Sequence, residues 1–237
     1  MKDGWFGGWI YSILGAQSVQ SQKDVINAVV GTTKFTDPEH AGWWTKLEES
    51  KKHKCWNDDI NSLELYQAQQ KFVDGKAAMT ITAGPDAPNF VKKAGGDEKV
   101  TIMAMPAWSD GPLAGKMGTT SQTLGITKWS KYPQVAADFL KFTHTTDRLN
   151  AWYAATGSMP ADDRFDLSQV TSASTKALFE SAINGAPYLE NFIPAQLDTD
   201  AVFKNVQLVL KGSISAADAA ADMQAVMERL RKSDRKL

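Results

Sequence analysis

The sequence has few of the residues that build disulfides and metal sites. It contains one cysteine, Cys55, and three histidines, His40, His53 and His144, among 237 residues. A single cysteine excludes an internal disulfide, and no His or Cys pair has the spacing of metal ligands. His53 and His144 fall late in expected helices, where positive charge is favourable. We therefore expect no metal ion and no cofactor, and we interpret Cys55 as a small apolar residue at a helix end.

An excess of charge and long apolar runs are also absent. The 26 Lys and Arg residues nearly balance 27 Asp and Glu residues, for a net charge of -1. No stretch approaches the ~18 apolar residues that a transmembrane helix needs. One basic cluster lies near the C-terminus, where it complements a helix dipole, so we expect no nucleic-acid partner. Its members are Arg229, Arg231, Lys232, Arg235 and Lys236.

Signatures of catalysis are missing as well. No nucleophile elbow, phosphate-binding loop or dinucleotide fingerprint occurs. Acid pairs occur at residues 48–49, 58–59 and 162–163. Glycoside hydrolysis needs two carboxyl groups at a defined separation across a bond, whereas adjacent acids usually lie on a solvated surface. We therefore assign no catalytic residue.

The composition is that of a folded protein, with 43% hydrophobic and 22% charged residues. The apolar run from Trp5 to Leu14 follows Lys2 and loosely resembles a signal peptide. A folded helix is the alternative, and Asp3 and the glycines in this region favour it. Trp5 and Trp9 are four residues apart and would share one face of that helix.

Capping residues and helical spacing predict a chain rich in helices. Asp37 followed by Pro38 is a strong helix start, and Ser215 with Asp218 resembles a capping box. We expect helices over residues 5–15, 21–30, 37–53, 63–73, 86–93, 130–144, 147–155, 174–183, 197–210 and from 215 onward.

Strand-like segments are few. Residues 77–82, 99–105 and 120–126 have the composition of strands, and residues 108–118 form a loop rich in Gly and Pro. These strands are too few and too scattered for a complete sheet of their own. The sequence therefore predicts a helix-rich α/β fold.

Two blocks of sequence resemble one family. Residues 72–84 (FVDGKAAMTITAG) and 125–142 (GITKWSKYPQVAADFLKF), followed by TGSMPA at 156–161, are similar to extracellular solute-binding protein family 1. These are the maltose-type carbohydrate-binding proteins of ABC importers. A weaker third block, GSISAADA at 212–219, resembles the family's final helix.

The resemblance implies a periplasmic-binding-protein-like type II fold that is incomplete here. Family members are longer and have two α/β lobes. Residues 1–237 resemble only the C-terminal portion, namely the second lobe plus elements that return to the first. The first half of lobe one has no counterpart, which leaves open a truncated or partial form of a larger protein.

The resemblance also implies the function. We expect a protein that is not an enzyme, that binds a mono- or oligosaccharide between its lobes and that delivers it to the membrane subunits of an ABC importer. The full-length protein would be periplasmic or extracellular. A carbohydrate-active hydrolase and a binding-protein lobe reused as a sensor module are the alternatives.

Ligand-binding residues follow by position from the family. Sugars combine apolar C–H faces with hydroxyl groups, so their sites pair aromatic rings with a few polar groups. Core packing is the alternative role for Trp5 and Trp9, helix capping is the alternative for Asp86, and Trp108 is either a contact or a cover. The expected ligand-binding residues are Trp5, Trp9, Gly84, Pro85, Asp86, Gly118, Thr119, Thr120 and Phe203.

Overall fold

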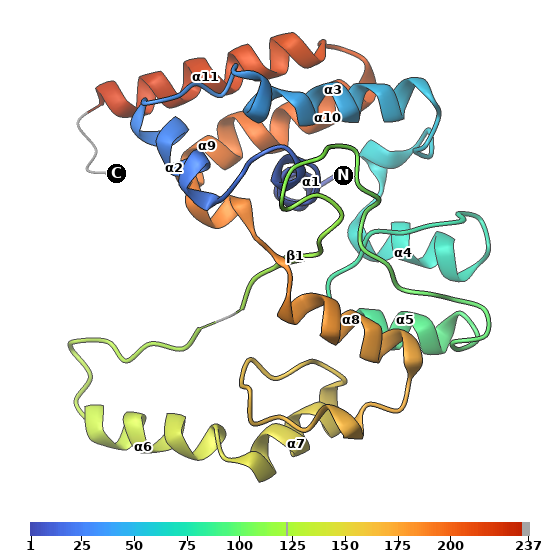
Figure 1. Cartoon of the computed structure of the whole chain (residues 1–237), viewed down its shortest axis with the longest axis vertical. Helices are drawn as coiled ribbons and strands as arrows, with labels where there is room; N and C mark the ends of the chain where they lie inside the picture. Colours follow the sequence, from blue (N-terminus) through green and yellow to red (C-terminus); the bar gives the residue numbers. More distant parts are fainter. Residues whose placement is uncertain (122, 234–237) are drawn as a thin grey trace. The chain divides into compact units, whose positions relative to one another are not determined.

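A computed structural model of the chain describes residues 1–121 and 123–233 (Figure 1). The chain forms two compact units. Unit 1 comprises Met1–Ala78, Ala104–Thr119 and the residues from Ser181 onward, and unit 2 comprises Met79–Met103 and Thr120–Glu180. The chain therefore passes from one unit to the other four times, after residues 78, 103, 119 and 180.

Unit 1 is a helical assembly in which α3 packs on α11 and α10, and α1 packs on the turns that precede α10. Its α-helices are α1 (Phe6–Leu14), α2 (Gln22–Val30), α3 (Pro38–Lys52), α4 (Leu65–Val73), α9 (Ala195–Leu197), α10 (Lys204–Lys211) and α11 (Ala216–Lys232). Shorter turns are η1 (Gly15–Gln17), η2 (Ile60–Ser62), η4 (Leu189–Phe192) and η5 (Asp198–Phe203).

Helix α3 begins and packs as its sequence predicts. Asp37 is its extended N-cap residue and Pro38 its first residue, but the Asp37 side chain makes no capping hydrogen bond and accepts instead from the backbone N–H of Lys34 at 2.8 Å. Trp43, Trp44 and Leu47 are fully buried, with the two indole rings 3.8 Å apart between centroids. Burial of these three large side chains holds α3 against α10 and α11.

Helix α11 covers the other side of α3. Ser215 and Asp218 form a complete capping box, as the sequence predicts. The last turn carries Arg229, Arg231 and Lys232, in agreement with the helix-dipole interpretation. Arg235 and Lys236 lie outside the described residues.

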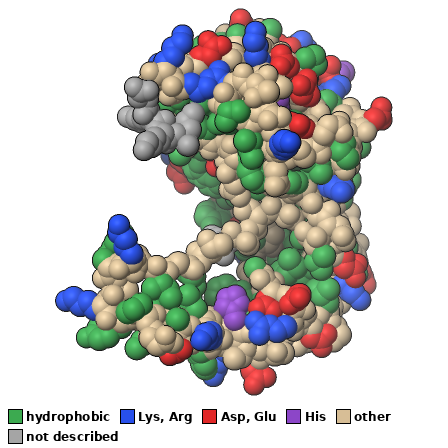
Figure 2. All heavy atoms as spheres, turned by 60° about the vertical axis from the view of Figure 1, so that its left-hand side comes forward, with side chains coloured by type: hydrophobic (Ala, Val, Ile, Leu, Met, Phe, Trp, Pro, Cys, Tyr) green, Lys and Arg blue, Asp and Glu red, His purple; other side chains and the backbone are tan. Residues whose placement is uncertain are grey.

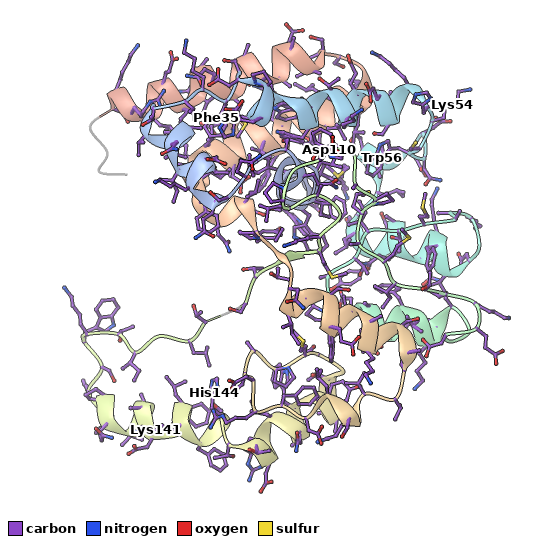
Figure 3. All side chains as sticks on the ribbon, viewed as in Figure 1. Phe35, Lys54, Trp56, Asp110, Lys141 and His144 are labelled. Atoms are coloured by element: carbon purple, nitrogen blue, oxygen red, sulfur yellow. The ribbon has the colours of Figure 1, made fainter. Side chains whose placement is uncertain are left out.

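The segment between α2 and α3 is tied to α11 by a buried backbone contact. Phe35, labelled in Figure 3, is fully buried, and its backbone N–H donates to Gln224 Oε1 at 2.8 Å. Gly31 ends α2 with a φ of +93°, which suits glycine. These contacts fix α2 within unit 1.

Two helix predictions need correction. The expected helix over residues 197–210 is interrupted, because η5 is wound as a π-helix between α9 and α10. A π turn inserts a residue into the helical ladder and is invisible to 3.6-residue periodicity. The expected helix over residues 63–73 begins later, at Leu65, and Glu64 is its N-cap residue.

The strand predictions are wrong for the described residues. None of the segments 77–82, 99–105 and 120–126, with residue 122 outside the description, is a strand. The strands present are β1 (Gly118–Thr119) and β2 (Ala186–Pro187), which pair in parallel. A strand exists only when a neighbouring strand satisfies its backbone groups, and composition cannot supply that neighbour.

Unit 2 contains α5 (Ala87–Lys93), α6 (Pro133–Thr143), α7 (Thr146–Thr156), η3 (Leu167–Gln169) and most of α8 (Ala173–Ile183). Its small core is a cluster of three rings, Tyr153, Phe165 and Phe179, with centroids 5.2 to 6.5 Å apart. Asp97 accepts a hydrogen bond from the backbone N–H of Ala173 at 2.9 Å and so caps the start of α8.

Helix α6 is amphipathic but covers little with its apolar side. None of its residues is buried, and Val135 and Phe139 are 66% and 59% exposed. Hydrophobic side chains are visible on the open surface of the molecule (Figure 2). Among the described residues no helix is both long enough and apolar enough to cross a membrane.

We predict that Leu47→Ala lowers the free energy of unfolding of unit 1 by about 2–5 kcal/mol, because it leaves a cavity between tightly packed helices. Urea unfolding followed by tryptophan fluorescence measures this change. Thr45→Ala is the matched control on the exposed side of α3 and should change the value by less than about 0.5 kcal/mol. Equal effects of the two substitutions would contradict the described packing.

Candidate functional site

The aromatic face of α1 is the first component of the candidate site. Trp5 and Trp9 lie on one face with ring centroids 5.2 Å apart, as their spacing predicts. Phe6 completes the cluster, 5.1 Å from Trp9 and 6.1 Å from Trp5. Trp5 is 38% exposed, and Trp9 is half-buried. The cluster therefore presents partly open ring surface rather than a sealed core.

The glycines of α1 let other elements approach the helix directly. A Cβ at Gly7 would stand 3.0 Å from Phe203 Cα, and one at Gly4 would stand 3.5 Å from Phe203 Cβ. A Cβ at Gly8 would collide with the Glu190 carboxylate. The glycines thus place Phe203 of η5 and Glu190 of η4 against the same helix that carries the tryptophans.

Glu190 is held by a small polar network. Its backbone N–H donates to Ser12 Oγ of α1 at 3.2 Å. The hydroxyl of Tyr188 lies near both Ser12 and the Glu190 side chain, and burial raises the pKa of Tyr188 above its ordinary value. The Glu190 side chain is half-buried. A fixed carboxylate therefore stands beside the aromatic face of α1.

Asp198, the first residue of η5, forms a carboxyl pair with Glu190. It is 5% exposed, and its Oδ1 atom has no hydrogen-bond partner in the described part of the chain. Burial, together with the hydrogen bond and the charge of Glu190, raises the pKa of Asp198 to about 8. Asp198 is therefore mainly protonated near neutral pH, and the pair carries about one negative charge.

Strand β1 borders the same network. A Cβ at Gly118 would stand 3.7 Å from Ser12 O and 3.9 Å from Tyr188 Cδ2. Thr119 donates through Oγ1 to the carbonyl of Ala186 at 3.2 Å. Five of the expected ligand-binding residues therefore lie on or around α1. They are Trp5, Trp9, Gly118, Thr119 and Phe203.

The loop before β1 is anchored by the buried Gln17. Its Oε1 accepts from the backbone N–H of Trp108 at 3.0 Å, and its carbonyl accepts from Ser109 Oγ. The Trp108 ring packs on Gly42, where a Cβ would stand 3.2 Å away. Of the two roles left open for Trp108, the structure therefore favours packing.

The remaining four expected residues, Gly84, Pro85, Asp86 and Thr120, belong to unit 2. Gly84 and Pro85 are exposed, and Thr120 is the first residue of unit 2 after β1. Asp86 occupies the N-cap position of α5, but its side chain makes no capping hydrogen bond, so the capping alternative is not supported.

Unit 2 has an open pocket of its own, about 360 Å³ in volume. It lies between the start of α5 and the end of α7, where Gly157 approaches Pro88 closely. Lys92 is its one ionisable side chain apart from the Tyr153 hydroxyl. It is lined by Pro88, Asn89, Lys92, Tyr153, Ala154, Ala155, Thr156 and Gly157.

Over the described ranges, no group of three or more His, Cys, Asp or Glu is arranged to hold a metal ion. His144, labelled in Figure 3, ends α6 and pairs with Asp162 at 3.1 Å. The hydrogen bonds from Arg164 hold the pKa of Asp162 well below its ordinary value. Cys55 is exposed, which corrects its interpretation as a packed apolar residue.

Sequence reasoning missed Glu190, Asp198, Tyr188 and Ser12. Ser12 and Glu190 are 178 positions apart, so no local motif connects them. One signal was available: the three glycines at the start of α1 indicate close approach by another element. That signal does not identify the element.

The fold is that of sugar-binding proteins of known structure. The chain is similar to a chitin oligosaccharide binding protein (TM-score 0.75, 17% identity, 97% of this chain and 58% of that one). It is also similar to a structure from work on xylan utilization by the thermophilic bacterium Caldanaerobius polysaccharolyticus (TM-score 0.72, 19% identity, 94% of this chain and 59% of that one). A third similar structure is a cyclo/maltodextrin-binding protein complexed with maltotetraose (TM-score 0.65, 16% identity, 93% of this chain and 59% of that one).

The family follows from the sequence match. Residues 2–180 match the family model of bacterial extracellular solute-binding proteins, and the chain belongs to this family. The resemblance inferred from the sequence blocks is thereby confirmed, as is the helix-rich α/β fold class. The chain spans less than two thirds of each of the three structures. No curated protein sequence matches it.

We predict that Asp198 makes the stability of unit 1 depend on pH. A carboxyl group with a raised folded-state pKa stabilises the fold fully below its unfolded value of about 3.8, and this stabilisation is lost as pH rises to about 8. The melting temperature of the unmodified chain should therefore fall, relative to that of Asp198→Asn, between pH 5 and pH 8.5.

Thermal melts of both proteins across this range measure the difference. Asp200→Asn is the control, because it removes a carboxylate two residues away that pairs with Arg229 at 3.2 Å. The melting temperature of Asp200→Asn should change with pH in the same way as that of the unmodified chain. A constant difference between the unmodified chain and Asp198→Asn would show that Asp198 is ionised throughout.

Proposed function

We propose that this chain binds a carbohydrate in an interlobe cleft and delivers it to an ABC importer. The observation that carries the proposal is the face of α1, where partly open indole rings stand beside a fixed carboxylate and hydroxyl groups. A sugar needs this combination, since its C–H faces stack on rings and its hydroxyls donate to acceptors. The family and the fold of the sugar-binding neighbours support the same function.

The residues take complementary roles in this proposal. Trp5, Trp9 and Phe203 provide apolar surface, and Gly118 and Thr119 allow close approach of the backbone and offer a hydroxyl group. The remaining contacts come from unit 2. They are Gly84, Pro85, Asp86 and Thr120.

Transport follows from closure of the two lobes on the ligand. A sugar that contacts both lobes favours the closed form, because it makes the full set of contacts only there. The membrane subunits of the importer recognise the closed form. We further propose that the protein acts as a binder and not as an enzyme, in the periplasm or outside the cell, where its family acts.

We also propose that residues 1–237 are the C-terminal portion of a two-lobe protein. Three observations support this. The chain spans 58–59% of the similar structures. The apolar side of α6 has no buried residue. The strand-like segments at 77–82, 99–105 and 120–126 are not paired into strands in the described part. Additional polypeptide of the same fold would cover the helix and complete the sheet.

We predict that the chain binds a neutral oligosaccharide weakly, with a Kd on the order of 1 mM, because the proposal places part of the site in polypeptide outside residues 1–237. Saturation-transfer NMR with chitotriose, xylotriose and maltotriose suits such weak binding. Trp9→Ala should abolish the transfer to the bound sugar. Trp129→Ala is the control, since Trp129 is 75% exposed in unit 2 and outside the site.

Two results would contradict these proposals. If no sugar gives transfer with the unmodified chain, carbohydrate binding by these residues is wrong. If a sugar binds with micromolar affinity, the proposal that a large part of the site lies in absent polypeptide is wrong.

We predict that the uncovered face of α6 binds a hydrophobic fluorescent dye. The double variant Val135→Lys, Phe139→Glu should reduce the dye signal several-fold, because it removes the apolar centre of that face. Ile26→Lys, which changes an exposed apolar residue of unit 1 (42% exposed), should leave most of the signal. Absence of dye binding by the unmodified chain would mean that the chain covers this face itself.

A further inference from the structure

The carboxylate of Glu190 lies between two groups of residues that the proposed function assigns to the ligand. On one side, Gly8 gives it a place directly against α1, next in sequence to Trp9. On the other side, Tyr188 lies beside the carboxylate and Ser12, and β1 approaches Tyr188 and the Ser12 carbonyl at Gly118. The carboxylate is therefore at the junction of the aromatic and the hydrogen-bonding parts of the site.

The position of this carboxylate is fixed from three directions. Its backbone N–H donates to Ser12 Oγ, its carboxylate lies directly against α1 at Gly8, and the side chains of Tyr188 and Asp198 lie beside it. A surface glutamate has none of these restraints. A preorganised acceptor binds a ligand hydroxyl without losing further side-chain entropy.

The negative charge of the pair has no cationic partner. Along residues 1–121 and 123–233, no Lys, Arg or His forms an ion pair with Glu190 or Asp198. Asp198 is at the same time 95% buried, with its Oδ1 atom unpartnered. A partly buried charge without a partner destabilises a fold, and such charges concentrate at functional sites.

A ligand explains both features. Sugar hydroxyl and amide N–H groups are donors, and a fixed carboxylate without a cation has free lone pairs for them. The same carboxylate repels a ligand carboxylate or phosphate, because two like charges at close range in a poorly solvated site interact strongly. Selection by charge is a form of specificity that depends on repulsion.

We propose that Glu190 is a ligand-binding and specificity-determining residue that restricts this site to uncharged sugars and excludes uronates and sugar phosphates. This inference rests on the proposed carbohydrate-binding function and names the chemical class of its ligand.

The test compares neutral and anionic sugars on the full chain. Saturation-transfer NMR titrations use chitotriose, xylotriose and maltotriose as neutral probes and trigalacturonate as the anionic probe. With the unmodified chain, at least one neutral sugar should bind and trigalacturonate should not. Glu190→Gln should weaken the binding of neutral sugars about tenfold, since the hydrogen-bond acceptor loses its charge. The same substitution should reduce the difference in affinity between neutral and anionic sugars.

Matched variants separate the effect of position from that of charge. Glu190→Asp keeps the charge but shortens the side chain, so it should weaken neutral binding and still exclude trigalacturonate. Asp200→Asn removes one exposed carboxylate nearby and should change neither the affinity for neutral sugars nor the exclusion of trigalacturonate. Thermal melts of all variants establish that each is folded before the titrations are compared.

The outcomes are distinct. If the unmodified chain binds no sugar of either kind, the proposed function fails and this inference falls with it. If a neutral sugar binds and Glu190→Gln binds it equally well, the role of Glu190 alone is wrong. Binding of trigalacturonate by the unmodified chain as tightly as the neutral sugars would overturn the exclusion of anions.

Discussion

The absence of side chains along one side of α1 is the constraint on which the candidate site depends. Gly4 and Gly7 bring Phe203 of the π-helix against α1, and Gly8 makes room for the Glu190 carboxylate. A Cβ at Gly7 would press on the backbone of η5, and a Cβ at Gly8 would displace the Glu190 carboxylate from its place against α1. The helix that carries Trp5 and Trp9 therefore also determines where the polar groups stand.

This arrangement places two opposite environments within one turn of one helix. The indole rings offer apolar surface, while the carboxyl pair keeps a negative charge that no cation balances in the described structure. A core with this composition would gain stability by replacing the acids with apolar residues. The loss of stability caused by the buried acids is offset where a ligand supplies hydrogen-bond donors to them, as a sugar does.

Local sequence rules predicted the helices well and the site only in part. The Asp37 and Ser215 starts, the glycine ends and the buried Trp43 and Trp44 depend on residues within one or two turns. The π-helix, the pairing of β1 with β2 and the contact of Glu190 with α1 depend on residues far apart in the chain. Spacing cannot reveal these contacts. Family resemblance supplied the positions around α1 but not the acid pair.

The helices α1 and α6 show why an apolar pattern does not reveal its partner. Both have a marked apolar side, but α1 buries six of its nine residues, whereas α6 buries none. Periodicity indicates that a helix has an apolar face that packs against another element. It does not indicate where in the protein that element lies. About two fifths of the length of each similar structure lies outside the part that this chain matches. In the proposal, additional polypeptide of the same fold supplies both the cover for α6 and the partners for the unpaired strand-like segments. The same proposed polypeptide then explains both the open face of α6 and the strand-like segments that are unpaired among the described residues.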